Sequence, residues 1–442
     1  MTYEKVINYI DSLPRFIPVK TCKGRPLFNL ETVTELAKRF DNPQDKIKCV
    51  HIAGTNGKGS VTEFLSEILL KSGYKVGTFT SPYLIDIREQ TKVDGVMITE
   101  SEFTEIFIPI IKESEKMYRE TGVRPSEFEM DVVASFLHFF NNQCDICIIE
   151  TGLGGEYDAT NIISNPLLCI FTEISKDHMM ILGDSLQSIS AVKSGIIKDG
   201  CLCITGRQTE SVMNVLQKKA SEMNSVFYIA DFPEEQNIGI DGTEFRIKID
   251  GKMEWFETKV TGSYQVENAV LAIAASEELK ENGFSNVNIE SIRKGLLSTK
   301  RPGRFQVIKR DPLIIADGAH NVSGVKVMLD SLKMIFPNRY DSGKGFVFVV
   351  GVMEDKEYKI MIEQVVPHAF KIFCVTPKNV RALPALRLSN EFISSGAEAE
   401  SFENINDALE EAMRTSKNNN MPAIIFGTLY CMGDVLNYFE EK

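Results

Sequence analysis

The residues best suited to chemistry follow a short apolar run near the start of the chain. The run CVHIA over residues 49–53 predicts a buried strand, the loop GTNGKGS follows it, and apolar residues at helical spacing come next. Backbone N–H groups of such a loop, together with the N-terminus of a helix behind it, can enclose phosphate groups. Lys58 is expected to reach the β- and γ-phosphates of a nucleotide, and the Ser60 hydroxyl to contact magnesium. The nucleotide-binding candidates in this loop are Gly54, Thr55, Asn56, Gly57, Lys58, Gly59 and Ser60.

The glycine spacing of this loop differs from that of the common P-loop. Counting back from Gly57 and Lys58, the first glycine of the common motif falls at position 52, which is Ile52. An ordinary glycine turn is therefore the alternative interpretation. A glycine, a lysine and a hydroxyl between a strand and a helix favour a phosphate site over a simple turn.

Glu150 ends a second apolar run, ICII over residues 146–149, and directly precedes Thr-Gly. Ligands of open α/β sheets gather at the carboxyl ends of the strands, which favours metal binding by Glu150 over the alternative of a solvated strand end. Magnesium prefers oxygen ligands and keeps several waters, so a few hydroxyl and carboxylate groups suffice. We therefore expect Ser60, Ser81 and Glu150 to hold Mg²⁺.

The elements that must position these groups alternate along the chain between strand-like and helix-like segments. The strand-like runs include KVGTFTSP, DICIIETG, PLLCIFTEI and CLCITG, and such alternation predicts a parallel sheet covered by helices. Between residues 227 and 260, short alternating runs around two Asp-Gly pairs, at 241–242 and 250–251, predict a small antiparallel meander. Further strand-like runs in the last third of the chain predict a second α/β domain.

The expected fold class is therefore α/β. We expect a P-loop-type domain with a mostly parallel sheet and a small antiparallel meander, followed by a smaller Rossmann-like α/β domain. Glycine, proline and charge gather between Ser298 and Arg304, where we place the boundary. The expected domains are thus a nucleotide-binding domain over residues 1–298 and a C-terminal domain over residues 299–442.

The composition limits the classes of partner. The chain has 442 residues and a formal charge of −12 without a long basic block, which disfavours binding to nucleic acid or to an anionic membrane surface. Its apolar runs are far shorter than the roughly 20 residues that span a bilayer, and the start MTYEKVINYID has no basic segment followed by an apolar run. We expect a cytoplasmic protein with no nucleic-acid or membrane partner, in which local groups hold any anionic substrate.

A series of motifs extends the signal of the loop along the chain. In order, they are HIAGTNGKGS, SPYL, ETGLGGEYDATN, KDHMMILGDS, KSGIIK, GSYQVENAVLAI, RPGRFQ, DGAHN and FGTLY. Together they resemble the Mur ligase superfamily, and within it the folylpolyglutamate synthase and dihydrofolate synthase family. The resemblance implies a ligase that uses ATP and Mg²⁺ to add L-glutamate to the γ-carboxyl of reduced folate through an acyl phosphate. Dihydropteroate glutamylation is a second or alternative activity, and we expect a monomer acting on these small-molecule substrates.

The resemblance also implies roles for residues outside the loop. His178, in KDHMMILG, is similar to a ligand of a second magnesium ion, and Lys193, in KSGIIK, is similar to lysines that are carbamylated by carbon dioxide. A carbamate replaces a cation with a carboxylate-like group that can offset metal charge. The simpler alternatives are a loop histidine and a surface lysine. The residues that the resemblance implies at the ATP are Asn268, Arg304, Asp317 and His320, and the catalytic candidates are Lys58, Lys193 and His320.

Two other function classes stay open at this point. A phosphate-transferring or regulatory NTPase needs the loop and a metal but no amine substrate. A thiol or zinc module could use Cys144 and Cys147, although the apolar run around them favours reduced core thiols. The departures from the family pattern that bear on the substrate site are Tyr83 in place of His, Glu156-Tyr157 in place of Arg and an apolar residue, and Thr428 in place of Ser.

Overall fold

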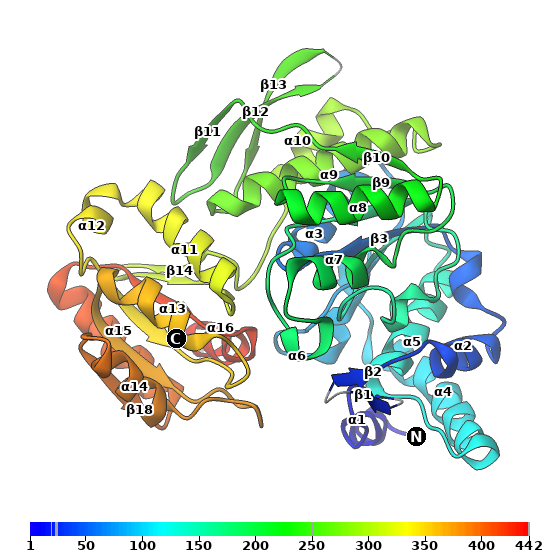
Figure 1. The fold of residues 1–442 in the computed structure, drawn as a ribbon, viewed down its shortest axis with the longest axis horizontal. Coiled ribbons are helices and arrows are strands. Elements are labelled where there is room, and N and C mark those ends of the chain that lie inside the picture. Colours follow the sequence, from blue (N-terminus) through cyan, green and yellow to red (C-terminus); the bar gives the residue numbers. More distant parts are fainter. Residues whose placement is uncertain (19, 23–24, 250, 441–442) are drawn as a thin grey trace. The chain divides into compact units, whose positions relative to one another are not determined.

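The computed structural model describes residues 1–18, 20–22, 25–249 and 251–440 and divides into two compact units. The first unit contains Met1–Asp231 and Asn268–Leu296, and the second contains Phe232–Glu267 and Leu297–Lys442. Helix α9 (Ser263–Glu281) crosses this division (Figure 1). The meander therefore groups with the C-terminal residues. The expected domain boundary between residues 298 and 299 stays a prediction.

An eight-stranded sheet forms the centre of the first unit. Six neighbouring strands run parallel, and the last two continue the sheet in antiparallel pairing. The two central strands are buried along their whole length, which agrees with apolar runs covered by helices on both faces. In spatial order the strands are β10 (Val226–Ile229), β9 (Leu202–Thr205), β8 (Leu168–Phe171), β3 (Cys49–Ala53), β7 (Ile146–Glu150), β4 (Val76–Phe79), β5 (Thr91–Val93) and β6 (Val96–Met97).

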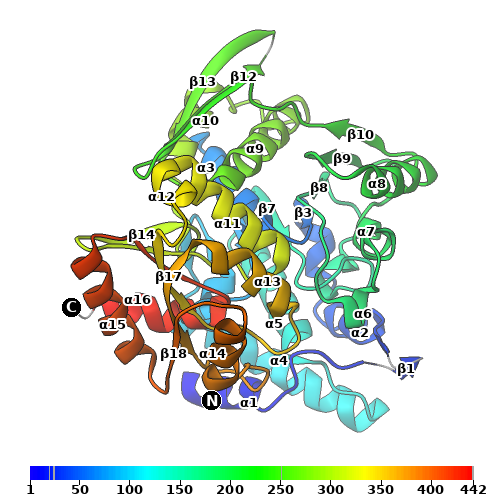
Figure 2. The same ribbon diagram turned by 60° about the vertical axis from the view of Figure 1, so that its left-hand side comes forward.

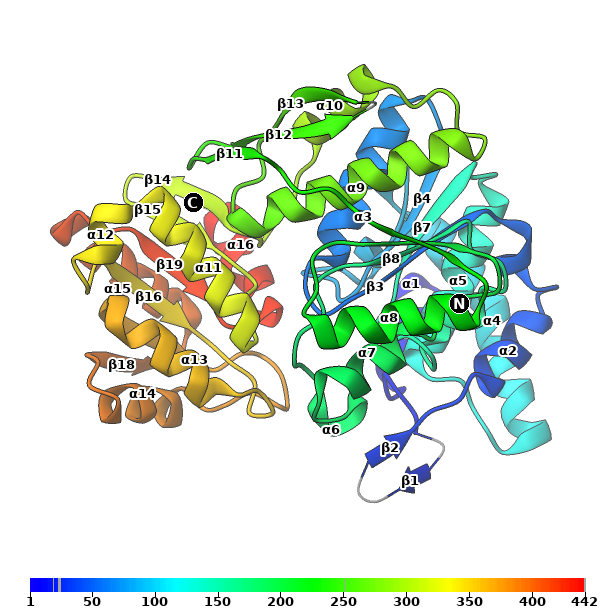
Figure 3. The same ribbon diagram turned by 45° about the horizontal axis from the view of Figure 1, so that its top comes forward.

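Helices pack on both faces of this sheet. One core joins α1, α2, α4 and α5 to β4 and β7, and another joins α7 and α8 to β8 and β9. The strand residues of both cores lie on the same face of the sheet, because Cys49 pairs with Cys147 and Cys169 pairs with Cys203 in register, whereas α3 belongs to neither core and contacts β4 and β7 (Figure 3). Reciprocal side-chain caps at Ser126 and Glu129 begin α5 and fix where this helix starts. None of the helices in the described ranges is long and apolar enough to cross a membrane. The helices are α1 (Tyr3–Asp11), α2 (Glu31–Lys38), α3 (Lys58–Lys71), α4 (Glu100–Thr121), α5 (Glu127–Asn141), α6 (Met179–Leu182), α7 (Leu186–Ser194), α8 (Glu210–Glu222) and α10 (Ile289–Ser298), and a short hairpin pairs β1 (Lys20–Cys22) with β2 (Arg25–Leu27).

A six-stranded sheet forms the centre of the second unit, and five of its strands are parallel. Helices α11, α13 and α14 share one core with the sheet, whereas α15 contacts β16 and β17 outside that core and covers the opposite face (Figure 2). The predicted Rossmann-like arrangement is confirmed. In spatial order the strands are β14 (Gln306–Arg310), β15 (Leu313–Ala316), β19 (Ala423–Phe426), β16 (Phe346–Val350), β17 (Ala369–Val375) and β18 (Ala399–Phe402), and the helices are α11 (Val322–Ile335), α12 (Pro337–Asp341), α13 (Tyr358–Val365), α14 (Ala385–Ser394), α15 (Ile405–Asn419) and α16 (Met432–Glu440).

The predicted meander is present but begins later than expected. Strands β11 (Glu235–Ile238), β12 (Thr243–Ile249) and β13 (Lys252–Thr258) pair antiparallel, and the first Asp-Gly pair lies in the turn between β11 and β12. Asp250, of the second pair, lies outside the described residues. The predicted start at residue 227 is wrong, because residues 226–229 form β10 and pair parallel with β9. An alternating run predicts that a strand forms. Which strand it pairs with depends on packing against residues that are distant in the sequence.

Candidate active site

The candidate residues of the first unit gather at one edge of its sheet. Strands β8, β3, β7 and β4 are consecutive and parallel, so their carboxyl ends lie side by side. The loop 54–57 follows β3, Glu150 ends β7, Ser81 follows β4, and the segment 173–178 follows β8. Strand order therefore explains how groups far apart in the sequence reach the same edge.

Two glycines allow the loop to approach its neighbours closely. A Cβ atom on Gly54 would lie 1.8 Å from the Thr172 hydroxyl oxygen, and a Cβ atom on Gly57 would lie 2.3 Å from Asn268 Oδ1. Gly57 also has a φ of +92° at the N-cap of α3, a conformation that residues with a side chain rarely adopt. The same close approach brings Asn268, in α9, against the loop.

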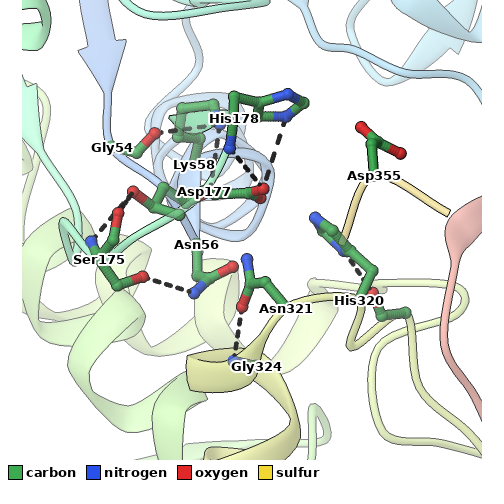
Figure 4. A network of polar contacts seen from close by, with 12 residues as sticks. Gly54, Asn56, Lys58, Ser175, Asp177, His178, His320, Asn321, Gly324 and Asp355 are labelled. Atoms are coloured by element: carbon green, nitrogen blue, oxygen red, sulfur yellow. Dashed lines mark hydrogen bonds and ion pairs between the residues drawn. The ribbon is translucent and has the colours of Figure 1, made fainter. Parts of the chain in front are cut away.

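The segment after β8 holds the loop in place. The Thr55 N–H donates to the Glu173 carbonyl oxygen at 2.8 Å, and the Asn56 side-chain amide donates to Glu173 Oε2 at 2.8 Å. The Thr55 hydroxyl donates to the Ser175 carbonyl at 3.0 Å and accepts from the Ser175 N–H at 3.0 Å. The Asn56 side-chain amide also donates to the Ser175 hydroxyl at 3.4 Å, and Figure 4 shows these two side chains facing each other. The loop is therefore ordered before any ligand arrives, which lowers the entropic cost of binding.

Two lysines point at the same carbonyl of the loop. Lys58 Nζ donates to the Gly54 carbonyl oxygen at 3.3 Å (Figure 4). It also donates to the Thr55 carbonyl oxygen at 3.4 Å and lies 3.7 Å from Glu150 Oε1. Lys193 Nζ, from α7, donates to the Gly54 carbonyl at 2.6 Å. Two cations and one carboxylate thus meet beneath the glycine loop.

Lys193 is buried, so the alternative of a surface lysine is wrong. Burial, together with the charge of Lys58, lowers the pKa of its ammonium to about 7, against the opposing effect of the carboxylates of Asp177 and Asp158. A fraction of Lys193 is therefore a neutral amine near pH 7. Neutral amines, unlike ammonium ions, are nucleophiles.

The oxygen ligands expected for magnesium lie at this edge, but they are few. Ser60 and Glu150 are each 4% exposed and offer a hydroxyl and a carboxylate, a donor set that fits Mg²⁺ with water completing its shell. His178 precedes α6 in a left-handed conformation; its N–H donates to Asp177 Oδ1 at 2.8 Å, and its Nε2 lies 3.9 Å from Asp177 Oδ2 (Figure 4). Within the described ranges, no three His, Cys, Asp or Glu side chains form a ready-made metal site.

Three further candidates, Arg304, Asp317 and His320, come together in the second unit, at the end of β15. His320, seen in Figure 4, bonds the Gly318 carbonyl through Nδ1 at 2.8 Å. Arg304 Nη1 donates to the same carbonyl at 3.5 Å. Asp317 is buried and accepts from the N–H of Ala319 at 2.7 Å. Burial raises the pKa of Asp317, and the nearby Arg304 charge opposes that shift.

The structure also holds an apolar pocket of about 160 Å³ that was not predicted from the sequence. Phe16 and Phe128 pack against each other, with ring centroids 5.4 Å apart, and line the pocket together, and the carboxyl groups of Glu129 and Asp158 are its acidic members. Its segments are distant in sequence, so its only sequence signal was the motif ETGLGGEYDATN, which contributes one wall. The other lining residues are Ile17, Phe28, Asn29, Ser126, Leu153, Tyr157, Ala159, Ile181, Leu182 and Val192.

A chain of buried hydrogen bonds links this pocket to β3. The Thr160 hydroxyl donates to Asp158 Oδ1 at 2.6 Å, so it accepts from His51 Nε2–H at 2.8 Å. Burial lowers the pKa of His51 to about 3, which keeps its ring neutral. Asp158 Oδ2 accepts from the Leu153 N–H at 2.6 Å, so both carboxylate oxygens are fixed.

Comparison with known proteins agrees with this geometry. The Mur ligase middle domain matches residues 52–276, and the Mur ligase glutamate ligase domain matches residues 303–428. A dihydrofolate synthase/folylpolyglutamate synthase from Bacillus subtilis is 32% identical over 413 residues, which cover 92% of this chain and 94% of the relative. The chain belongs to the folylpolyglutamate synthase/dihydrofolate synthase family of Mur ligases.

Solved structures of this family share the fold. A folylpolyglutamate synthase complex with AMPPCP and folate has a TM-score of 0.83 and 25% identity over 98% of each chain. The Mycobacterium tuberculosis folylpolyglutamate synthase complexed with ADP has a TM-score of 0.89 over 99% of this chain and 98% of the other, with 24% identity. The predicted α/β fold class is therefore confirmed.

The residues that depart from the family pattern have different surroundings. Tyr157 lines the apolar pocket and is half exposed, whereas Glu156 is exposed and its N–H donates to the Val192 carbonyl at 2.8 Å. The Thr428 hydroxyl accepts from the Tyr430 N–H at 3.3 Å and caps a short helical turn. Of the four, Tyr157 is thus the one that the structure puts against the pocket; Tyr83 lies outside its lining.

Proposed function

We propose that this protein is an ATP-dependent ligase that joins L-glutamate to the γ-carboxyl of a reduced folate. The observation that carries the proposal is the pair of lysines, Lys58 and Lys193, beneath the glycine loop, in the same unit as an aromatic-walled pocket. Lys58 can stabilise phosphate charge, Lys193 can hold the carbamate that offsets metal charge, and the pocket can take a flat ring. The Bacillus relative is named for both folate ligations, and the solved complex contains AMPPCP and folate.

Ligation consists of two displacements in which charge dominates. A γ-carboxylate oxygen of the folate attacks the γ-phosphorus of ATP, ADP leaves, and an acyl phosphate forms. The amine of glutamate then attacks the acyl carbon, loses a proton, and phosphate leaves. Lys58 neutralises charge on the β- and γ-phosphates, while the N–H groups of loop 54–60 and the start of α3 hold them.

The cofactor assignment includes Mg²⁺, which neutralises phosphate charge when it is bound. Ser60, Ser81 and Glu150 would hold it, and His178 is the ligand assigned to a second ion. Lys193 is assigned as a carbamate: its neutral amine bonds the carbon of carbon dioxide and releases a proton. The burial of Lys193 supports this assignment, because burial favours the neutral amine over the ammonium.

The other end of the nucleotide is assigned to Asn268, Arg304, Asp317 and His320. An arginine on the phosphates stabilises the charge that develops as the γ-phosphoryl group transfers. The contact of Arg304 and His320 with one carbonyl, that of Gly318, supports their acting together. This proposal keeps an ATP-binding domain at residues 1–298 and a glutamate ligase domain at residues 299–442.

The apolar pocket is proposed to receive the pterin end of the substrate. Phe16 and Phe128 offer ring faces for stacking, and such contacts add to the burial of a flat aromatic ring. The carboxyl groups of Asp158 and Glu129 can accept hydrogen bonds from N–H groups of a pterin ring. Tyr157, at the same pocket, is then a residue that shapes substrate preference.

The proposal includes dihydropteroate as a second or alternative substrate, because it carries the same ring and a carboxyl group. A regulatory NTPase, by contrast, has no use for an aromatic-walled pocket in the same unit as its phosphate loop. We further propose a cytoplasmic monomer whose partners are small molecules, with neither nucleic acid nor membrane among them.

The direct test is product identification. Purified protein is incubated with ATP, Mg²⁺ and labelled glutamate, with dihydropteroate or tetrahydrofolate added separately, and products are weighed by mass spectrometry. We expect a product heavier than the acceptor by one glutamate residue. If neither acceptor gains glutamate while ATP is hydrolysed, the NTPase alternative replaces the ligase.

A further inference from the structure

Phe305, next to Arg304, has an unusual backbone conformation. Its φ is +45°, in the left-handed region that bulky residues seldom enter, and strain of this kind persists only where the surroundings enforce it. The Phe305 side chain is 1% exposed and belongs to the core of the second unit. Core packing therefore fixes one side of the strained residue.

A buried carboxylate fixes the other side. The Phe305 N–H donates to Asp317 Oδ2 at 2.9 Å, and the Tyr264 hydroxyl donates to the same oxygen at 2.7 Å. Asp317 Oδ1 accepts from the Ala319 N–H at 2.7 Å. Burial and the Asp317 charge hold the pKa of Tyr264 well above its usual value, so the hydroxyl stays a donor. Hydrogen bonds to an ionised acceptor are among the stronger ones in proteins.

The residues that flank Arg304 are tied down on both sides. The Gly303 N–H donates to Gln306 Oε1 at 2.8 Å, and the Gly303 carbonyl accepts from the Gly318 N–H at 2.7 Å. The guanidinium of Arg304 reaches the Gly318 carbonyl. Residues 303–305 are therefore held against the turn 317–319 by backbone and side chain together, and the Tyr264 hydroxyl joins this arrangement at Asp317 Oδ2.

We propose that Tyr264 is a positioning residue that fixes Arg304, through Asp317 and Phe305, in the orientation that meets the nucleotide. This inference rests on the proposed function, in which Arg304 contacts the ATP phosphates. Loss of the Tyr264 hydroxyl leaves one donor fewer on Asp317 Oδ2 and weakens the hold on the strained Phe305. The Arg304 guanidinium then samples more orientations, and the transition state loses a preorganised charge.

The test is a double-mutant cycle with Tyr264→Phe, Arg304→Ala and both together. Tyr264→Phe keeps the ring, so the chain folds, and we expect kcat/KM for ATP to fall about tenfold while the KM values for folate and glutamate stay within about twofold. In the Arg304→Ala background the same change should lower kcat/KM by less than about twofold, because the group that Tyr264 positions is already gone. Hydrogen exchange at the Phe305 amide should speed up in Tyr264→Phe.

Tyr358→Phe is the matched control. Tyr358 lies in the same unit and its hydroxyl also bonds a charged group, accepting from Arg387 Nη2 at 3.3 Å, so its loss should change kcat/KM for ATP by less than about twofold. If Tyr264→Phe lowers kcat/KM for ATP equally in the wild-type and in the Arg304→Ala background, the inference is overturned and the proposed function stands. If Arg304→Ala keeps full turnover, the role of Arg304 in the proposed function is wrong and the inference falls with it. The two failures are thus distinguishable.

Discussion

The two ammonium groups at the loop share one acceptor. Lys58 and Lys193 both donate to the Gly54 carbonyl, at 3.3 and 2.6 Å, and Glu150 lies 3.7 Å from Lys58. Like charges in a poorly solvated site repel strongly, and a single carboxylate offsets this repulsion in part. Loss of the Lys193 charge, as in the proposed carbamate, relieves this repulsion and leaves Lys58 as the cation that meets the nucleotide phosphates.

Replacing Lys58 with alanine should abolish ligation and leave the fold intact. The loss removes the ammonium that neutralises the transferring phosphate, so we expect kcat/KM for ATP to fall at least about 100-fold. Lys71→Ala is the control, because Lys71 ends the same helix, is largely exposed and pairs with Glu67. Circular dichroism and turnover are measured together. Near wild-type turnover in Lys58→Ala would rule out the phosphate role.

Asp131 gives a prediction about pH. It is buried in α5, Gln90 Nε2 donates to its Oδ2 at 3.1 Å, and burial, with the Glu127 charge, raises its pKa to about 8 despite the opposing charge of Arg15. The same carboxyl in an unfolded chain has a pKa of about 3.9. Between these values the unfolded chain has lost a proton that the folded chain keeps, so stability falls as pH rises from about 4 to about 8.

Asp131→Asn has no proton to lose in this window. We expect the variant to be more stable than wild type by about 1–3 kcal/mol at pH 8 and about equal to it at pH 4. Urea unfolding at both pH values measures the difference. If the variant loses as much stability as the wild type between these pH values, groups other than Asp131 cause the loss.

At the scale of elements, the sequence predicted well those features that lie in one continuous stretch of residues. The loop 54–57 lies between β3 and α3, and residues 58–60 begin α3, as the strand, glycine and helix pattern indicated; the apolar run at 146–149 lies in β7 with Glu150 at its end. The bond between Lys193 and Gly54 joins residues 139 positions apart, and no spacing predicts such a contact. The resemblance, not the pattern, singled out Lys193.

The pocket could not be predicted for the same physical reason. Its walls come from residues 16–17, 28–29, 126–129, 153–159 and 181–192, and most of the side chains that they contribute are apolar types that also occur in ordinary core. An apolar side chain that faces a cavity and one that faces another side chain have the same hydrophobicity. Only the tertiary arrangement distinguishes the two cases.

The segment that carries Phe16 and Ile17 forms one wall of this pocket and is anchored by Arg15. Arg15 Nη1 lies 2.9 Å from Glu127 Oε1, and the guanidinium sits 5.6 Å from the centroid of the Phe128 ring. The Arg15 carbonyl also accepts from the Phe128 N–H at 3.4 Å. A charge pair that is partly shielded from water and stacked on an aromatic ring is worth more than an exposed pair.

Arg15→Ala should therefore loosen the wall of the pocket and leave the nucleotide loop unchanged. We expect KM for the pterin substrate to rise about tenfold while KM for ATP changes by less than about twofold. Arg124→Ala is the matched control, because Arg124 also pairs with a glutamate, Glu115, and lies over a ring, that of Tyr118, without lining the pocket. A parallel rise in both KM values would contradict a pocket-specific role.

On the scale of the whole molecule, a chain with a net charge of −12 has to bind substrates that are themselves anions. The field of the whole protein opposes their approach, so binding depends on the few cations held at the loop and on backbone N–H groups. Bound ATP is then stabilised locally, but hydrolysis by water would waste it. A ligase avoids that loss when phosphoryl transfer requires the acceptor carboxylate in place.

ADP release should therefore depend on the other substrates. Without a folate carboxylate no acyl phosphate can form, and without glutamate the acyl phosphate has no amine to discharge it, so we expect ADP production to fall at least about tenfold when either substrate is omitted. A coupled assay of ADP, run with each substrate left out in turn, measures this dependence. Inorganic phosphate should appear in a one-to-one ratio with the new amide. Full ADP production with neither substrate present would identify a nucleotide hydrolase, whereas dependence on both identifies a reaction in which phosphoryl transfer waits for the groups it serves.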